Sequence, residues 1–324
     1  MASYNGKKLG DRFLIEKPLS NAGGTASVYL GYLLEEPGMK VAIKLARTGP
    51  NGPAHEDILL QHETELLCKR NWRHPGLVRL FPLSHAERPV YCLRATELPE
   101  APYYMVMEYL AGGSLIENKN KLRGMSFEWK LELFYQILLA VSFLHEKRFA
   151  HRDLKPENIV FRRPISPAEI PQPVLIDFAL ASDGNSGSEI IEKSYTLEYA
   201  SPERIARGLG TGALSSGDRF PLQGDVWSLG VIFYEILTNT RLMSGSHDAV
   251  RTTLITRSFE EKIRGVDFGH DTLLRRQSYR EKMPLLAKYI RAMLIHNPEE
   301  RLTVQDVIYG METNFHRSEE RRVG

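Results

Sequence analysis

The hydrophobic pattern of the sequence changes once, near residue 111, and this change constrains the fold more than any other feature. Before it, short apolar or alternating runs predict β-strands around one helix. The strands are expected at 12–20, 26–34, 39–46 and in "GLVRLFPLS" and "YYMVMEYL", and the helix at 55–72. After it, apolar residues recur three and four positions apart, as in α-helices. The sequence therefore predicts an α+β chain with a small β-rich lobe, which holds one main helix, and a larger helical lobe.

The larger lobe is predicted from long helical segments. "SFEWKLELFYQILLAVSFLHEK" (126–147) is amphipathic, with Ser126 as its N-cap. "DVWSLGVIFYEIL" (225–237) is apolar nearly all round, which predicts a buried helix. "PLLAKYIRAMLI" and "TVQDVIYGM" add further helices, and "RRPISPAEIPQP" (162–173) is expected as a Pro-rich surface insertion between two short strands.

Charge and cysteine content narrow the class of protein. The chain carries 42 Lys and Arg against 40 Asp and Glu, so a net charge of +2 gives no reason to expect nucleic acid or a membrane surface as a partner. The longest apolar run, "ILLAVSFL" (137–144), is far too short to span a membrane. No secretory signal is visible, and Cys68 and Cys92 lack metal-ligand spacing, so we expect reduced thiols and a cytoplasmic protein.

The last eight residues, "RSEERRVG" (317–324), continue none of these patterns. We interpret them as foreign to the native protein and leave them out of the fold. An ordinary charged, frayed tail is the alternative.

Residues 151–158 read "HRDLKPEN", a combination that suits phosphoryl transfer. Asp153 can accept the proton of a substrate hydroxyl, Lys155 can neutralise charge on the transferred group, and Asn158 can hold a metal ion through its side-chain oxygen. A polar loop at a helix end is the alternative. The combination of residue types at this spacing argues against it.

With this motif, the chain resembles the protein kinases over residues 12–312. "HRDLKPEN" is similar to the kinase catalytic loop, and its "LKPEN" part is similar to the serine/threonine branch of the family. The resemblance implies a bilobal protein-kinase-like fold, with an N-lobe at 12–107, a hinge at 108–113, a C-lobe at 114–312 and a tail at 313–324.

Further motifs occur in the order that the family has them. "VAIK" resembles the third strand of the kinases, which implies that Lys44 holds the α- and β-phosphates of ATP. "DFA" stands where the family has Asp-Phe-Gly, which implies that Asp177 binds Mg²⁺. "SPE" resembles the motif that closes the activation segment, and Glu203 is expected to pair with Arg301. Asp225 is expected to anchor the catalytic loop.

The Gly-rich loop is the weakest match. Aligned with the family pattern, "NAGGTASV" keeps Gly23, while Asn21 and Ala26 replace the other two glycines. An ordinary hairpin turn is the alternative, and we favour a phosphate-covering loop because of the strand context and the lysine that follows.

The helix partner of Lys44 is ambiguous. The family places a glutamate ten residues before the Pro of "HP", which gives Glu65, while Glu63 is the rival. Residues two apart on a helix cannot face the same way, so only one can pair with Lys44. We prefer Glu65.

The resemblance also implies an adenine site. In this site the roof would consist of Leu19, Val28 and Ala42, and the floor of Val160. Met107 would lie at the back of the pocket. The backbones of Glu108 and Leu110, in the hinge, would bind the adenine.

The segment between "DFA" and "SPE" is expected to control activity. Thr196 matches the family's Thr-x-x-Tyr, which implies that it bridges Asp153 and Lys155. Ser188 or Ser194 is the expected phosphorylation site, with the phosphate pairing with Arg152. Autophosphorylation through a transient dimer follows from this expectation.

We therefore expect a serine/threonine kinase that uses ATP and Mg²⁺ on protein substrates. The alternative is a pseudokinase scaffold that binds nucleotide without efficient transfer, motivated by departures from the family at Asn21, Ala26, Ala179 and Tyr195. Every charged position is kept, which favours activity. Whether Ala179 strains its motif depends on whether that position needs a left-handed backbone.

Overall fold

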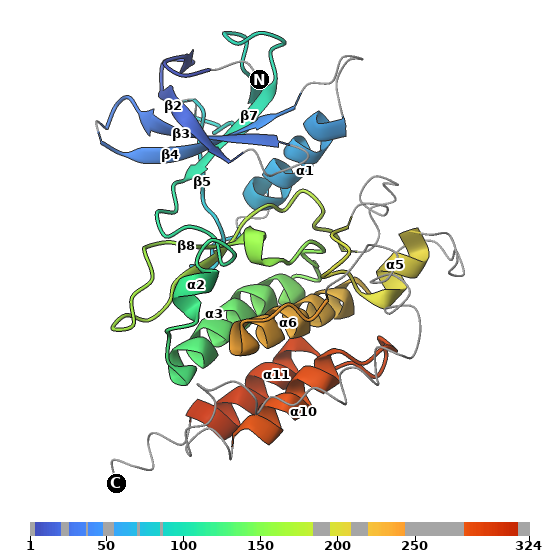
Figure 1. Cartoon of the computed structure of the whole chain (residues 1–324). Coiled ribbons are helices and arrows are strands. Elements are labelled where there is room, and N and C mark those ends of the chain that lie inside the picture. The colour runs from blue at the N-terminus through green and yellow to red at the C-terminus, as the bar shows by residue number, and fades with distance from the viewer. Residues whose placement is uncertain are drawn as a thin grey trace. The chain divides into compact units, whose positions relative to one another are not determined.

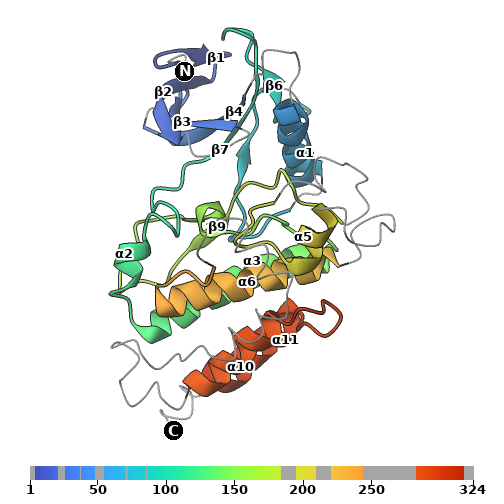
Figure 2. The same ribbon diagram turned by 45° about the vertical axis from the view of Figure 1, so that its right-hand side comes forward.

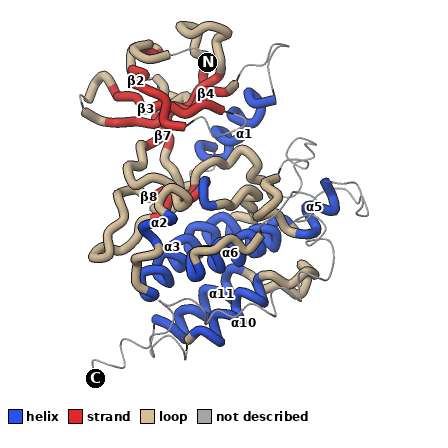
Figure 3. The backbone as a smooth tube through the Cα atoms, in the orientation of Figure 1, coloured by secondary structure: helices blue, strands red, loops and turns tan. Residues whose placement is uncertain are grey.

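The computed structural model describes residues 4–20, 26–36, 38–47, 55–69, 72–84, 87–183, 195–208, 220–243 and 282–316. The chain divides into two compact units. The first runs as far as Ala111 and also takes in Ile176–Ala179, while the second begins at Gly112 and resumes at Leu180. Strands dominate the first unit and helices the second (Figure 3), so the α+β prediction is confirmed.

The first unit is built on an antiparallel sheet, with α1 (His55–Lys69) as its main helix (Figure 1). The strand order is β1-β2-β3-β4-β7-β5, and β6 also pairs with β7. The strands are β1 (Lys8–Leu9), β2 (Phe13–Ser20), β3 (Ala26–Leu33), β4 (Lys40–Ala46), β5 (Leu80–Phe81), β6 (Leu93–Arg94) and β7 (Tyr103–Glu108).

The two faces of this sheet carry different kinds of side chain. One face carries a hydrophobic cluster that includes Tyr29, Ile43 and Val106. Because side chains alternate along a strand and cross-strand partners point the same way, the pairs Val28–Lys44 and Lys44–Met105 lie on the opposite face. That opposite face is therefore the one that presents Lys44, and α1 contacts both β4 and β7.

The second unit is a helical assembly with a small antiparallel pair of strands, β8 (Ile159–Phe161) and β9 (Pro173–Leu175). In Figures 1 and 2, α3 lies beside α6, with α10 and α11 on the far side of that pair from β8 and β9. The described helices are α2 (Lys119–Leu122), α3 (Phe127–Glu146), α5 (Pro202–Gly208), α6 (Pro221–Thr238), α10 (Met283–Met293) and α11 (Val304–Met311), with short helical turns at Pro156–Asn158 and Glu312–His316.

Helix α6 forms the centre of this unit, as its apolar sequence predicts. Its residues from Asp225 to Phe233 are buried without a break. The Phe233 ring stacks on Phe134 of α3, with ring centroids 3.7 Å apart. Ser126 caps α3 by accepting the N–H of Trp129, which confirms the predicted N-cap.

The Pro-rich stretch connects β8 and β9 where the sequence predicts an insertion. The Trp129 indole Nε1–H is shared between the carbonyl oxygens of Ser166 at 3.1 Å and Glu169 at 2.9 Å. These bonds hold the insertion against the start of α3. In the described part of the chain, no helix combines the length and the hydropathy that a membrane span needs.

Candidate active site

The first unit carries a buried cluster of three charged side chains. Lys44 Nζ lies 2.6 Å from Glu63 Oε2 and 2.9 Å from Asp177 Oδ1. Lys44 and Glu63 are buried, while the Asp177 side chain is 31% exposed. Burial alone would lower the pKa of Lys44, but the carboxylates of Asp177 and Glu63 outweigh it and raise that pKa above its ordinary value. Lys44 therefore stays a cation, with one partner facing solvent.

The prediction that Glu65 pairs with Lys44 is wrong, because Glu63 takes that place. Glu65 is exposed on the other side of α1. Leu59, Leu60, Leu66 and Leu67 are buried and lie three or four positions from Glu63, so they share its helix face. The phase of this apolar stripe is the signal in the sequence that would have selected Glu63.

The Asp177–Phe178–Ala179 motif is tied to the same glutamate. The backbone N–H of Phe178 donates to Glu63 Oε1 at 3.0 Å, and the Phe178 ring is fully buried. Asp177 has a left-handed backbone with φ of 64°. Ala179 is not one of the described non-glycine residues with positive φ. The position occupied by Ala179 therefore needs no glycine in this conformation, and alanine causes no backbone strain there.

The second unit holds the residues of "HRDLKPEN" around Asp153. Thr196 Oγ1 donates to Asp153 Oδ1 at 2.8 Å, and Lys155 Nζ donates to Oδ2 at 2.6 Å. Lys155 Nζ also lies 3.1 Å from Thr196 Oγ1, so the threonine bridges the two residues as the sequence predicts. Asn158 donates from Nδ2 to the Asp153 carbonyl at 2.9 Å and to Oδ2 at 3.0 Å. The Asp153 carboxylate is thus held by three side chains.

Asp225 fixes the backbone of this loop from inside α6. Its carboxylate accepts the N–H of His151 at 2.7 Å and of Arg152 at 2.8 Å. His145 Nε2 lies 3.0 Å from Asp225 Oδ2. Burial would raise the pKa of Asp225, but the hydrogen bond and charge of His145, with the backbone N–H groups, bring that pKa below its ordinary value. Arg152 has a φ of 67°, which these bonds help to maintain.

Glu203 and Arg301 form the predicted ion pair. The guanidinium binds the carboxylate through two bonds, of 2.8 Å and 3.1 Å. Arg301 also donates to the Gln223 carbonyl at 2.6 Å and lies over the Trp227 ring. The pair therefore joins the end of the "SPE" motif to α6.

Several residues of this unit were not found from the sequence. His145 is one, although a histidine in the last turn of a buried helix was a usable signal. The Tyr199 hydroxyl donates to Glu235 Oε2 at 3.0 Å, a partner that the Thr-x-x-Tyr match does not indicate. Arg152 Nη1 donates to the buried Ser182 Oγ at 2.6 Å, a contact that no motif indicates.

Tyr195 stands where the family usually has glycine, and the structure supplies a local reason why it is accommodated. A Cβ on Gly208 would lie 2.5 Å from Tyr195 Cε1, closer than side-chain carbons approach. The ring therefore packs on the bare backbone of α5. Ser186, Ser188 and Ser194 lie outside the described residues.

The residues expected near adenine are distributed as follows. Ala42 pairs with Met107 across β4 and β7 and both are buried, on the sheet face that also carries Val28. Leu19 is exposed, Leu110 is half-buried, and Val160 lies in β8 of the second unit. The Glu108 N–H donates to the Arg79 carbonyl at 2.9 Å, and its carboxylate accepts the Arg79 N–H. Gly23 falls outside the described residues.

Each unit presents one side chain with the chemistry of a magnesium ligand, Asp177 in the first unit and Asn158 in the second. Across the described ranges, no group of three or more His, Cys, Asp and Glu side chains could hold a metal by itself. Both amide hydrogens of Asn158 point to Asp153, which leaves its side-chain oxygen directed away from that residue. Asp177 keeps a partly exposed carboxylate. Mg²⁺ is usually bound by only one or two protein carboxylates, and phosphate oxygens of the substrate and water molecules complete its coordination.

The fold and the two charged clusters define a phosphoryl-transfer domain. A family model described as "Protein kinase domain" matches residues 21–310, and the chain belongs to this family. Proteins of the family use ATP with Mg²⁺, and a serine/threonine kinase is among the curated relatives of this domain.

Curated relatives support the same class. The "Probable serine/threonine-protein kinase MARK-A" of Dictyostelium discoideum is 26% identical over 298 residues, which cover 91% of this chain and 23% of that protein. "Death-associated protein kinase 2" of Mus musculus is 26% identical over 313 residues, which cover 95% of this chain and 73% of that protein. "Putative ribosomal protein S6 kinase alpha-2" of Caenorhabditis elegans is 36% identical over 175 residues, 51% of this chain and 20% of that protein. The pseudokinase alternative receives no support from these relatives.

Proposed function

We propose that this chain transfers the γ-phosphoryl group of ATP to serine or threonine hydroxyls of protein substrates, with Asp153 orienting the acceptor hydroxyl. The observation that carries this proposal is the Asp153 carboxylate, whose two oxygens are held by Thr196, Lys155 and Asn158. A carboxylate fixed in this way can accept a hydroxyl proton without reorganising first. Positioning is the main contribution that phosphoryl transfer requires of a protein.

Besides binding the Asp153 carboxylate, Lys155 would act on the transferred phosphoryl group. Its ammonium lies on the same carboxylate and on Thr196 Oγ1, so its charge is held beside the point where the acceptor would react. It would neutralise negative charge that develops on the transferred group. Thr196 limits where this lysine can point.

The nucleotide side of the mechanism belongs to Lys44 and its partners. Glu63 holds the Lys44 ammonium and, through its other oxygen, the backbone of Phe178. Lys44 would bind the α- and β-phosphates of ATP, and Asp177 and Asn158 would hold Mg²⁺. Bound Mg²⁺ would neutralise phosphate charge. The backbones of Glu108 and Leu110 would bind the adenine edge, beside Val28, Ala42 and Met107.

We also propose that phosphorylation of the activation segment regulates the kinase. Phosphorylation at Ser188 or Ser194, in a transient dimer, would order the activation segment through Arg152.

A cytoplasmic location is supported by Cys68 and Cys92, which are both free thiols. We assign the kinase domain to residues 12–312 and propose that 317–324 are foreign to the native protein.

A phosphotransfer assay with purified protein, ATP, Mg²⁺ and casein tests the proposal. Replacing Asp153 by Asn should lower the rate by about 100-fold or more, because the base is lost while the size of the side chain is kept. Asp183→Asn is the matched control: this aspartate is exposed, and the rate of this variant should equal that of the wild type. Equal transfer by the Asp153→Asn protein and the wild type would overturn the proposal.

A further inference from the structure

The stretch of chain that precedes β7 carries the short strand β6 and lies next to α1 (Figure 2). We call residues 87–102 the β6 connection, and no motif of the sequence indicates a function for it. Arg94 in this connection reaches Asp57 in the first turn of α1. We propose that Arg94 is a positioning residue for phosphotransfer, which holds α1 where Glu63 meets Lys44. This inference rests on the function proposed above and adds a residue that belongs to none of the motifs.

The β6 connection is anchored in the hydrophobic cluster on one face of the sheet. Ala95 and Leu98 are buried members of that cluster. The N–H of Ala95 donates to the Pro102 carbonyl at 2.8 Å, and the N–H of Leu98 donates to the Ala95 carbonyl at 2.9 Å. A side chain carried by this connection is therefore fixed relative to the sheet.

Arg94 points to the other face of the sheet. In the register of β6 and β7, Arg94 pairs with Tyr103. Because Tyr104 belongs to the hydrophobic cluster, the adjacent Tyr103 and its partner Arg94 point away from that cluster. They share the face that presents Lys44, which is also the face that α1 contacts. The alternation of the strands thus directs the Arg94 side chain toward α1.

Three contacts hold the Arg94 guanidinium in place. Nη1 donates to the Ala101 carbonyl at 3.1 Å, the guanidinium carbon lies 4.3 Å from the centroid of the Tyr103 ring, and Nη2 lies 3.8 Å from Asp57 Oδ2. Ala101 has a φ of 41°, a backbone conformation that residues other than glycine seldom adopt. The first two contacts are made within the β6 connection and β7, so they orient the guanidinium for the third.

Asp57 is the group on α1 that depends on this cation. Asp57 is 3% exposed, and within the described ranges neither of its carboxylate oxygens has a hydrogen-bond partner. A buried carboxylate without hydrogen bonds is stabilised by a nearby cation, and loss of the cation leaves its charge uncompensated. Movement of the first turn of α1 away from Arg94 is therefore unfavourable. The helix dipole also favours an acid in this turn, so Arg94 is the residue to replace first.

A fixed first turn determines where Glu63 lies. Helix α1 runs without a break over 15 residues, and Glu63 follows Asp57 by six residues, which is about 9 Å along the axis. Glu63 Oε2 lies 2.6 Å from Lys44 Nζ, a distance that a small shift of the helix would lengthen. Arg94 therefore acts on Lys44 through α1.

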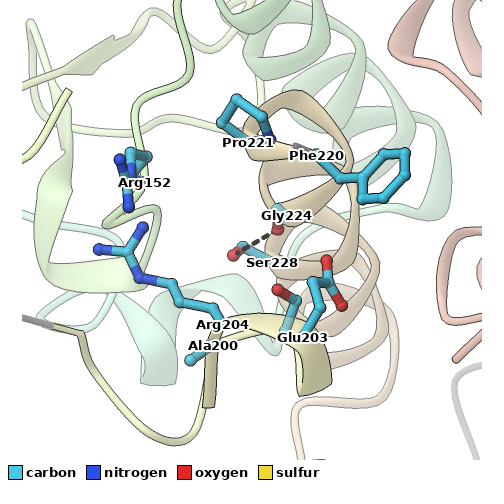
Figure 4. Close-up of a pocket in the computed structure, with 9 residues that line it drawn as sticks. Arg152, Ala200, Glu203, Arg204, Phe220, Pro221, Gly224 and Ser228 are labelled. Atoms are coloured by element: carbon cyan, nitrogen blue, oxygen red, sulfur yellow. Dashed lines mark hydrogen bonds between the residues drawn. The ribbon is translucent and has the colours of Figure 1, made fainter. Parts of the chain in front are cut away.

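Hydrogen exchange at the Phe178 amide tests the proposal without depending on activity. This N–H is bonded to Glu63 Oε1, so it should exchange faster when α1 moves. In the Arg94→Gln protein, NMR should show exchange at this amide that is faster by about fivefold or more. The reference is α6 in the second unit, where Ser228 Oγ is bonded to the Gly224 carbonyl (Figure 4), and its amides should exchange at the wild-type rate.

Kinetics with casein, ATP and Mg²⁺ show whether the effect passes through Glu63. Arg94→Gln should lower kcat/KM for ATP by about threefold to tenfold in the wild type, and by less than about 1.5-fold in the Glu63→Gln protein. An arginine with a structural role alone would lower stability in both proteins and leave the kinetics of the folded fraction unchanged. Arg94→Lys should recover part of the loss, because it keeps a positive charge beside Asp57.

Arg88→Gln is the matched control. Arg88 is an exposed arginine of the same connection, so its replacement should leave both the Phe178 exchange and kcat/KM at wild-type values. Thermal unfolding shows that each variant is folded.

Unchanged exchange at Phe178 in folded Arg94→Gln protein overturns the proposal, and so does an equal kinetic loss with and without Glu63. If Arg94→Gln does not fold, Asp57→Asn breaks the same ion pair, and unchanged Phe178 exchange in that variant overturns the proposal as well. If the wild type transfers no phosphate, the function proposed above fails, and exchange at Phe178 still decides whether Arg94 positions α1.

Discussion

Glu63 joins Lys44 to the Asp177 motif through its two carboxylate oxygens. Oε2 lies 2.6 Å from Lys44 Nζ, and Oε1 accepts the N–H of Phe178 at 3.0 Å. One side chain of α1 thus sets both the phosphate-binding lysine and the backbone that follows Asp177. This makes the position of α1 within the first unit a determinant of the site.

Replacing Glu63 by Gln tests this relationship. Glutamine keeps an oxygen for Phe178 but removes the charge that holds Lys44. We expect a phosphotransfer rate lower by about tenfold or more, and a loss in the free energy of unfolding of about 2–3 kcal/mol, because a buried charge loses one of its two partners. Steady-state assays and urea denaturation measure the two effects.

Glu65→Gln is the control for that experiment. Glu65 has the same chemistry and lies two residues away, but it is exposed. We expect wild-type activity and a change in the free energy of unfolding within about 0.5 kcal/mol. A rate loss in Glu65→Gln with none in Glu63→Gln would contradict the assignment of Glu63.

The second prediction concerns acid stability and Asp225. Its pKa is lowered in the folded protein, so its stabilising contribution is present above the unfolded value of about 3.8–3.9 and is lost as the pH falls through the lower folded value. Asp225→Asn should therefore be less stable than the wild type by about 2–4 kcal/mol near neutral pH. The difference between the two proteins should shrink as the pH falls from 6 to 3.

Urea denaturation across this pH range measures the difference. Asp183→Asn serves again as the comparison, because this aspartate is exposed. A difference between wild type and Asp225→Asn that stays constant down to pH 3 would show that the carboxylate charge does not hold the loop.

Predictions from the sequence are most accurate for the site residues that belong to motifs, in which charged and polar residues stand at fixed spacing. Asp153, Lys155 and Thr196 meet as predicted, since the loop motif and the Thr-x-x-Tyr match place each of them. The choice between Glu63 and Glu65 needed the phase of the buried face of α1, which alignment to a motif does not provide. Contacts between segments that no motif joins, such as Arg152 with Ser182, depend on tertiary packing and have no local signal in the sequence.

The contact between Tyr195 and Gly208 gives a third prediction. Gly208→Ala would place a methyl group 2.5 Å from the Tyr195 ring, so the end of that side chain must shift and the protein should lose about 1 kcal/mol in its free energy of unfolding. Combining it with Tyr195→Gly should recover part of that loss, because the ring that clashes is gone. A double-mutant cycle by chemical denaturation measures the coupling, and additive losses would show that the two residues do not interact.

The last prediction concerns Ala179, whose backbone is not left-handed in this structure although Asp177 is. Glycine at this position adds conformations to the unfolded chain and to alternative arrangements of the motif, while it removes no contact with a charged group. We expect Ala179→Gly to lower the free energy of unfolding by about 0.4–1 kcal/mol and to leave the maximal rate nearly unchanged. The affinity for nucleotide-competitive inhibitors, which depends on the arrangements open to the motif, should change more than the rate. Side-by-side measurement of kcat and of a panel of inhibition constants decides the matter, and a large gain in kcat from this single change would show that alanine restrains the chemistry itself.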